Sequence, residues 1–454
     1  MNSQTFFRYG TALAAGHMRP KQRLWTEPEG VRGGEPGVSV VIPSRNGKEL
    51  LRAQLPGIAR DLDPLAGEIL VVDNGSDDGT AAWLAGAWPS VQVEVSPQPL
   101  SFACAVNRGV VRAGYSHICL LNNDMLLEPG FFAALGGAFD LVPDLFCATA
   151  QIRFPEGARR EETGKAVMAR ETPADFPLRC DLPLPGEDLT WVLYGSGGCS
   201  VYDALKLRAL GGVDEIYGPA YVEDLDLGYR AWQKGWPSVY VAGALVEHRH
   251  RATTSRYYSE AQLDAILEVN YLKFLSRAVA SPKLFRRLWK EAMERLKTRA
   301  EHSAAAREAL AAAARIAVAG GPREVTVQPE EDFLALTNGS VAVFPGHAPT
   351  GQPRTLVAAW SVSGPKGRRA AANFDQVLVA FTERWEPPPP EILAVCTEVV
   401  LVRRPASLGR RSAAFGAALR LSMRKWRPSE VRLESKIMQE YTPDCAPAKV
   451  IWSR

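Results

Sequence analysis

The 454-residue sequence lacks several features that would assign it to common classes of protein. Its seven cysteines form no C-x-x-C pair and no zinc-like spacing, which favours reduced thiols in a reducing compartment. No apolar run reaches the ~18–20 residues of a membrane span, and the first residues lack the apolar core of a signal peptide. A formal net charge of +3 is too small to indicate nucleic-acid binding. We therefore expect a cytoplasmic protein with no nucleic-acid partner.

Two glycine-rich motifs of nucleotide-binding proteins are also absent. The chain has no G-x-G-x-x-G stretch, which argues against a dinucleotide-binding fold, and no G-x-x-x-x-G-K-[ST] stretch, which argues against a P-loop. The composition is that of a globular protein, with 46% hydrophobic and 23% charged residues. A chain of this length exceeds one ordinary core, so we expect two or more domains.

Short apolar runs alternate with helical patterns in the first third of the chain. Strands are expected at residues 38–42, 68–72, 91–95 and 117–121. Apolar residues at helical spacing lie between them. This alternation predicts an α/β fold with a mostly parallel sheet covered by helices on both faces.

Polar side chains follow two of these expected strands directly. Asp73 comes after the second strand, ahead of a glycine-containing turn, and Asn122, Asn123 and Asp124 come after the fourth. Ligands bind at the carboxyl ends of strands in open α/β sheets, and oxygen-bearing side chains suit a hard divalent cation. The alternative is structural, because Asn and Asp also favour turns and could cap the helix expected near residues 129–135.

Successive motifs along the chain resemble those of family 2 glycosyltransferases, in particular its rhamnosyltransferase-like members. The motifs lie, in order, at residues 38–46, 73–80, 107–109, 122–124, 195–198, 223–230 and 248–250. The resemblance covers residues 38–275 and implies a GT-A fold. It implies an inverting transfer of a sugar from a nucleoside-diphosphate sugar to a hydroxyl of a glycan or a lipid-linked acceptor, as in cell-surface polysaccharide synthesis.

The resemblance also assigns residues to the nucleotide and to the metal. Asp73 would hold the base of the nucleotide, and Asp124 would be the last residue of an Asp-x-Asp motif that binds Mg²⁺ or Mn²⁺. The first position of that motif is Asn122, and the lost carboxylate should weaken metal affinity. The remaining residues assigned to the nucleotide are Pro43, Arg45, Asn107 and Asn123.

A histidine near the end of the matched region is the further metal ligand that the resemblance implies. His248 and His250 are the two candidates, and the spacing to Ser255 favours His250. Neutral imidazole is a common metal ligand. The alternative from the residues alone is that the two histidines simply lie in an exposed loop, as lone histidines usually do.

The segment 223–230 supplies the residue implied to be catalytic. The resemblance makes Asp224 the general base that deprotonates the acceptor hydroxyl, which requires a carboxylate within hydrogen-bond reach of that hydroxyl. Asp226 and Arg230 would support it by ion pairing. Glu223, Gly197 and Gly198 would contact the donor or acceptor sugar. The alternatives are that acidic residues are favoured by the dipole at a helix amino terminus, and that residues 195–198 form a plain tight turn.

We expect four segments in the chain. Residues 1–36 would be a loosely ordered extension, 37–275 the GT-A domain, 276–320 a helical and partly basic amphipathic segment, and 321–454 a partial Rossmann-like α/β region. The last segment resembles the amino-terminal half of a family 4 glycosyltransferase of the GT-B type. It is expected to add no second active site, so a chain ending near Pro322 should stay folded and active.

Two questions of function stay open at this point. The basic amphipathic helix expected around residues 283–299 either lies on an anionic membrane, at its inner face, or packs on the catalytic domain with its charges in solvent. The alternatives to a glycosyltransferase are a catalytically silent glycan-binding or scaffold protein with the same fold, which the Asn122 substitution favours, and a nucleotidyltransferase.

Overall fold

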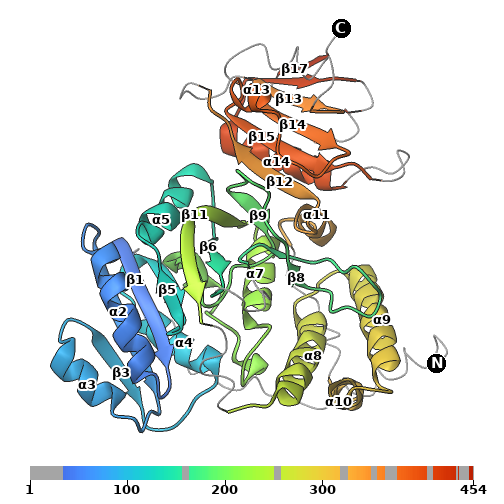
Figure 1. The fold of residues 1–454 in the computed structure, drawn as a ribbon. Coiled ribbons are helices and arrows are strands. Elements are labelled where there is room, and N and C mark those ends of the chain that lie inside the picture. Colours follow the sequence, from blue (N-terminus) through green and yellow to red (C-terminus); the bar gives the residue numbers. More distant parts are fainter. Residues whose placement is uncertain are drawn as a thin grey trace.

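The structure is a computed structural model that describes residues 34–155, 163–249, 257–316, 326–348, 355–362, 376–405, 413–435, 438 and 449–452. In this part of the chain a large sheet and a smaller sheet lie on either side of helix α11 (Glu330–Leu336), as Figure 1 shows. The expected α/β class is confirmed. His250 and Ser255, on which the choice of histidine depended, lie outside the described residues.

The large sheet is mixed but mostly parallel. β1 to β4 pair with one another in parallel, and β6 is parallel to β11. β10 runs antiparallel between β4 and β6, while β5 and β9 both pair antiparallel with β11. The strands in spatial order are β3 (Gln92–Ser96), β2 (Gly67–Asn74), β1 (Glu35–Ser44), β4 (Tyr115–Leu121), β10 (Cys199–Asp203), β6 (Cys147–Arg153), β11 (Ser238–His248) and β5 (Met125–Leu127), with β9 (Thr190–Val192) beside β11.

The central strands are continuous apolar runs because helices cover both of their faces. Val40, Val41 and Ile42 of β1 are all fully buried, although neighbouring side chains point to opposite faces. The covering helices are α2 (Lys48–Leu62), α3 (Thr80–Ala87), α4 (Phe102–Arg112), α5 (Phe131–Leu141), α6 (Ala204–Ala209) and α7 (Glu223–Gln233), with a short 3₁₀ helix η1 (Glu215–Tyr217) before α7.

The turn after β4 does not cap the next helix. The carboxylate of Asp61, at the end of α2, accepts hydrogen bonds from the backbone N–H groups of Gly130 (2.6 Å) and Phe132 (3.0 Å) at the start of α5. Asp61 therefore satisfies the free amides of this helix end. The structural alternative for residues 122–124, a cap on the helix near residues 129–135, is wrong.

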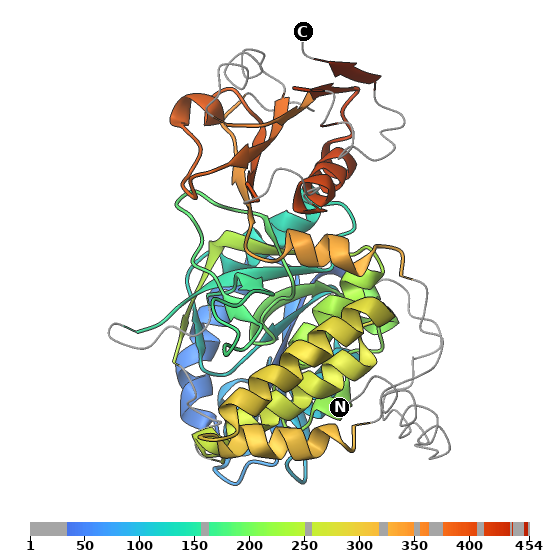
Figure 2. The ribbon, with the colours of Figure 1, turned by 90° about the vertical axis from the view of Figure 1, so that its right-hand side faces the viewer.

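Three further helices, α8 (Glu260–Arg277), α9 (Pro282–Arg299) and α10 (Ala304–Ala313), pack against one another, as Figure 2 shows. Phe274 of α8 contacts the ring of Tyr229 on α7. The apolar stripe of α9, including Leu288 and Leu296, is buried. Arg295 of α9 is also buried and forms an ion pair with Glu268 of α8. Packing on the catalytic domain therefore accounts for the apolar face of α9. In the described residues we find no helix with the length and apolar character needed to cross a bilayer.

The smaller sheet has the strand order of half a doubly wound fold. Its strands in spatial order are β12 (Val341–Pro345), β15 (Glu398–Arg403), β14 (Gln376–Thr382), β13 (Thr355–Ala359), β16 (Glu430–Leu433) and β17 (Lys449–Trp452). All neighbours are parallel except β12 and β15. From β15 to β17 the order is that of a Rossmann-like sheet, as expected. Its helices are α13 (Pro390–Leu393) and α14 (Ala413–Trp426).

Ligands of doubly wound sheets bind where the strand order reverses, which in this sheet is between β13 and β16. Trp360 follows β13, and its indole N–H donates to Ser435 Oγ (2.8 Å), just past β16. The backbone N–H of Trp360 donates to the carboxylate of Glu434 (2.6 Å), and its ring stacks on Phe381. Trp360 thus links the end of β13 to the end of β16, at the place where a doubly wound sheet would bind its ligand.

Helix α11 (Glu330–Leu336) joins the two sheets. Phe333 is fully buried, and its ring contacts those of Tyr229 (5.0 Å between centroids) and Trp232 (5.8 Å) on α7. The Glu330 carboxylate accepts from the side chain of Gln233 at the end of α7 and from two backbone N–H groups just before α9. Residues beyond 322 therefore complete the core around the helix that carries Asp224.

This packing changes the expectation for a shortened chain. A chain ending at Pro322 would lose Phe333 and expose the apolar face of α7, and deleting a buried Phe side chain alone costs about 3–5 kcal/mol. We therefore expect this chain to melt at a lower temperature than the full-length protein. Scanning calorimetry of both chains measures the difference in melting temperature. Equal melting temperatures would instead support the expectation from sequence, that a chain ending near Pro322 folds by itself.

Candidate active site

The loops after β1, β2 and β4 meet at one edge of the large sheet, because parallel neighbouring strands end on the same side. The backbone N–H of Asn46 donates to Ser76 Oγ (2.8 Å), and that of Asp77 donates to Asn46 Oδ1 (2.8 Å). Asn123 Nδ2 donates to Ser44 Oγ (2.9 Å). The structure therefore brings the expected nucleotide loops together.

The residues expected to bind the nucleotide line this edge. Asp73 is only 2% exposed and accepts a hydrogen bond from the backbone N–H of Ser76 (3.2 Å). Pro43 lies beside β2, opposite Val72. The Arg45 guanidinium lies over the ring of Tyr257, 4.0 Å from its centroid. Sequence reasoning missed Tyr257, whose only signal is an aromatic residue shortly after the histidine motif.

Asn107 has its polar atoms committed within the protein. Its Nδ2 donates to the backbone oxygen of Val213 (2.8 Å) and to Glu215 Oε1 (3.1 Å), and its Oδ1 accepts from the N–H of Val213 (2.9 Å). The side chain ties α4 to the loop before η1. Its role toward a nucleotide stays a prediction.

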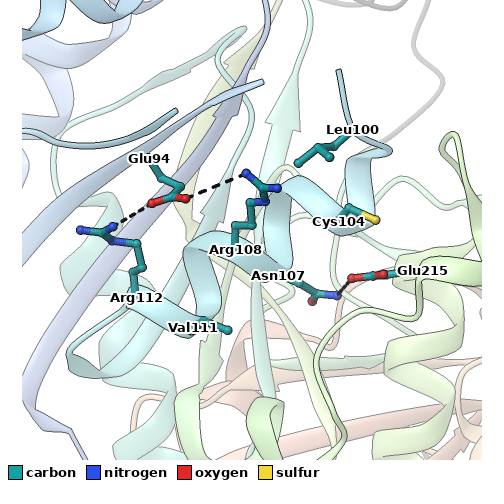
Figure 3. A pocket seen from close by; sticks show the side chains of 8 residues that line it. All are labelled: Glu94, Leu100, Cys104, Asn107, Arg108, Val111, Arg112 and Glu215. Atoms are coloured by element: carbon teal, nitrogen blue, oxygen red, sulfur yellow. Dashed lines mark hydrogen bonds and ion pairs between the residues drawn. The ribbon is translucent and has the colours of Figure 1, made fainter. Parts of the chain in front are cut away.

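A pocket of about 260 Å³ lies beside Asn107 on α4 (Figure 3). Glu94 of β3 interacts with Arg112 (2.7 Å) and Arg108 (4.0 Å) along one side, and Glu215 points toward Asn107 on the other. The lining thus carries two guanidinium groups and two carboxylates, of which Glu94 pairs with the arginines and Glu215 with the neutral amide of Asn107.

The candidate metal ligands Asp124 and His248 lie together. The pairing of β5 with β11 places His248 opposite Met125, so its Nε2 lies 3.6 Å from Asp124 Oδ2. Both residues are 7% exposed. Asp124 Oδ1 is buried and has no hydrogen-bond partner among the described residues. The structure thus assigns His248 a place beside Asp124, whereas the preferred candidate, His250, lies outside the described residues.

This pair fits part of a divalent cation site. Mg²⁺ is usually held by one or two carboxylates together with phosphate oxygens of a substrate, and a buried carboxylate oxygen without a protein partner is suited to that role. No group of three or more His, Cys, Asp or Glu side chains with metal-binding geometry occurs in the described part of the chain. The remaining ligands would therefore have to come from a substrate or from other residues.

The glycine turn, residues 195–198, lies near both Asn122 and the first turn of α7. A Cβ atom on Gly198 would lie 2.5 Å from Asn122 Nδ2, so any other residue at this position would displace the Asn122 side chain. A Cβ on Gly197 would lie 3.7 Å from that of Asp224. The backbone N–H of Asn122 donates to the oxygen of Gly198 (2.8 Å). Residues 197–198 therefore lie between Asn122 and the proposed base.

Helix α7 begins in an unusual backbone conformation. Tyr221 (φ +72°) and Val222 (φ +78°) are both in the left-handed region, which costs energy for residues with a side chain and often marks a functional site. Asp224 follows in the first turn and is half-buried. Asp226 accepts from Arg230 Nε (2.6 Å) and from the hydroxyl of Tyr217 (2.9 Å). Asp226 and Arg230 thus form an ion pair with each other, and their support of Asp224 stays a prediction.

Glu223 lies buried beside Asp224. Burial, and to a lesser extent the negative charge of Asp224, raises the pKa of the Glu223 carboxyl to about 8. Its Oε2 has no hydrogen-bond partner among the described residues. Glu223 therefore holds a proton at neutral pH, and the two adjacent carboxyl groups differ in environment, as acid–base pairs in enzymes do.

The raised pKa predicts a pH dependence of stability. Between pH 4.5 and about 8 the folded chain keeps a proton on Glu223 that the unfolded chain releases, so folding stability falls as pH rises through this window. Glu223→Gln removes the titrating group, and its melting temperature should rise relative to the natural chain from pH 5 to pH 8.5. Each kcal/mol corresponds to about 2–4 °C in a domain of 150–250 residues. If the difference in melting temperature between Glu223→Gln and the natural chain does not change with pH, the raised pKa of Glu223 is contradicted.

Comparison with known proteins now identifies the family. The model of the family described as glycosyltransferase-like family 2 matches residues 36–262. N-acetylglucosaminyl-diphospho-decaprenol L-rhamnosyltransferase of Mycobacterium tuberculosis is 29% identical over 213 residues, which cover 41% of this chain and 68% of that one.

Solved structures with a similar arrangement include GalNAc-T7 with UDP, GalNAc and Mn²⁺ (18% identity, TM-score 0.44). The match covers 60% of this chain and 58% of the GalNAc-T7 chain, less than two thirds of its length. Another is the mannosyltransferase PcManGT of Pyrobaculum calidifontis with GDP-Man and Mn²⁺ (16% identity, TM-score 0.41), with 73% of this chain and 85% of that chain covered. The family model spans half of the chain and includes every strand of the large sheet. The protein belongs to glycosyltransferase-like family 2 and is a glycosyltransferase.

Proposed function

We propose that the protein transfers a sugar, with inversion, from a nucleoside-diphosphate sugar to a hydroxyl of a glycan or lipid-linked acceptor. The observation that carries the proposal is the arrangement around the glycine turn. Asn122 lies against Gly198 and the Asp224 side chain beside Gly197, while Asp124, two residues along from Asn122, lies next to His248. A leaving-group site and a base on opposite sides of one short turn suit a direct displacement.

Residues at the sheet edge would bind the donor. Asp73 would accept from the base or ribose of the nucleotide, with Arg45 and Asn123 beside it. Asp124 and His248 would hold a divalent cation, Mg²⁺ or Mn²⁺. When bound, such a cation stabilises the negative charge of the departing diphosphate.

Asp224 would carry out the proton transfer. Its carboxylate accepts the proton of the acceptor hydroxyl as that oxygen forms its bond to the anomeric carbon. The bond from this carbon to the diphosphate oxygen breaks on the opposite face, which inverts the configuration. Glu223 is neutral at pH 7, so it would donate a hydrogen bond to a sugar oxygen and would not compete with Asp224 for the acceptor proton.

The acceptor we favour is lipid-linked. The mycobacterial relative is named for a decaprenol-linked acceptor, and α9 presents a basic face suited to an anionic membrane surface. Its exposed cations are Lys283, Arg286, Arg287, Lys290 and Lys297. Because the apolar face of α9 is buried, this contact would be peripheral and electrostatic, so binding to anionic vesicles should disappear at high salt.

A donor screen tests the proposal. UDP-, GDP- and dTDP-sugars, an L-rhamnose donor among them, are added with and without Mn²⁺, and thermal shift reports which of them stabilise the folded chain. The stabilising donor is then incubated alone and with acceptor, and released nucleoside diphosphate is measured. Turnover supports the enzyme. Binding without any release would favour a silent glycan-binding protein, and release of pyrophosphate from a nucleoside triphosphate would favour a nucleotidyltransferase.

A further inference from the structure

A buried asparagine on α8 contacts the segment that leads into the catalytic helix. Asn270 is 1% exposed, and its Nδ2 lies within hydrogen-bond distance of the backbone oxygens of Tyr217 (2.7 Å), Ala220 (2.9 Å) and Tyr221 (3.1 Å). Its Oδ1 accepts from Lys273 Nζ (2.9 Å). One side chain thus ties three carbonyl groups of residues 216–221, which we call the approach segment.

Other contacts fix the same segment. Lys273 also donates to the backbone oxygen of Ile216 (2.9 Å). From the opposite side, the backbone N–H of Phe102 at the start of α4 donates to the oxygen of Pro219 (3.0 Å). The approach segment is therefore held between α4 and α8, and Asn270 makes more hydrogen bonds to it than either of these residues.

The approach segment leads directly into the first turn of α7, which carries Asp224. It ends in Tyr221, which together with the next residue, Val222, is in the left-handed region immediately before α7. Such a conformation persists only when the surrounding structure enforces it. Asn270 bonds to the carbonyl of Tyr221 itself, so loss of this amide removes a restraint two residues before the Glu223–Asp224 pair.

We propose that Asn270 is a positioning residue that holds Asp224 in the orientation needed for proton transfer. The inference rests on the proposed role of Asp224 as base. Asn270 lies beyond residues 36–262, the part of the chain that the family model matches. Its contribution therefore comes from the helices that follow the matched region and not from the matched motifs.

The test compares Asn270→Ala with Leu275→Ala, which removes a buried side chain from the same helix but none of these hydrogen bonds. A misplacement of about 1 Å costs up to ~10²-fold in rate. We expect kcat of Asn270→Ala to fall by ~10–10²-fold, with the KM for the donor nearly unchanged. Leu275→Ala should lower the melting temperature and leave kcat close to that of the natural chain.

A double-variant cycle decides whether Asn270 acts through Asp224. In the Asp224→Asn background, Asn270→Ala should cause no further loss of kcat, because no base remains to be positioned. An equal loss in both backgrounds, an unchanged kcat in Asn270→Ala, or the same kcat loss in Leu275→Ala would overturn the inference. If Asn270→Ala does not fold, Lys273→Met is used in its place. This variant loses one hydrogen bond to the approach segment and should show a smaller loss of kcat. An unchanged kcat in Lys273→Met would also overturn the inference.

The two proposals fail in different ways. Full activity of Asp224→Asn would refute the assignment of the base, and with it the reaction as proposed. An inactive Asp224→Asn together with a normal Asn270→Ala would refute only the positioning role.

Discussion

Asp224→Asn should lower the rate of sugar transfer by about 10²–10⁴, the usual contribution of a positioned general base. Asn keeps the size and much of the hydrogen bonding of Asp but cannot take up the acceptor proton. The Asp224 carboxylate accepts from the backbone N–H of Leu225 (2.8 Å), and the amide oxygen of Asn can do the same. The helix should therefore stay intact. Initial rates at saturating donor and acceptor, with donor affinity measured by calorimetry, give both quantities.

Asp140→Asn is the matched control for this change. Asp140 is exposed near the end of α5. Its neighbour Phe139 contacts His117 near the start of β4, so Asp140 lies at the end of the strands opposite to the candidate active site. It should have normal activity. If donor affinity of Asp224→Asn falls as much as its rate, Asp224 binds the donor or shapes the site and is not the base.

Asp124→Ala should abolish the stimulation of transfer by Mn²⁺ or Mg²⁺. The change removes the one carboxylate of the Asp124–His248 pair, and carboxylate oxygens are the ligands these cations prefer. Because Asp124 Oδ1 has no hydrogen-bond partner among the described residues, the folded chain should lose little stability. Titration of transfer activity with Mn²⁺, alongside the melting temperature without metal, tests both expectations.

Two comparisons sharpen the result. Asp73→Ala should weaken nucleotide binding but keep the response to metal, since Asp73 lies near the end of another strand, β2. Asp140→Ala should change neither. Turnover by Asp124→Ala that rises with Mn²⁺ as in the natural chain would show that the cation binds elsewhere or is not used.

The sequence predicts those parts of the fold that depend on local pattern. Residues 38–42 and 68–72 are strands in the structure because a strand buried on both faces must be apolar throughout. Asp73 and Asp124 meet the same edge because neighbouring parallel strands end on the same side of a sheet. These features follow from the order of strands and helices alone.

The parts that sequence did not predict depend on contacts between distant residues. β10 lies between β4 and β6 and is antiparallel to both. An apolar pattern predicts that a segment is a strand, but it does not predict which strands will be its neighbours. His248 reaches Asp124 only through the pairing of β11 with β5. Phe333 and Asn270 look in sequence like ordinary members of apolar or amphipathic helices, and their role follows from which helix they face.

The position of α11 also bears on how the chain folds during synthesis. Tyr229 and Trp232 lie in α7, whereas the ring that covers them, Phe333, is made much later. At 5–20 residues per second, the roughly one hundred intervening residues take about 5–20 s to translate. During that time the back of the catalytic helix has no Phe333 against it, and its aromatic surface is available to a chaperone or to a neighbouring nascent chain. Sequence changes around residue 333 should therefore lower the yield of folded protein in cells in addition to lowering the stability of the finished enzyme.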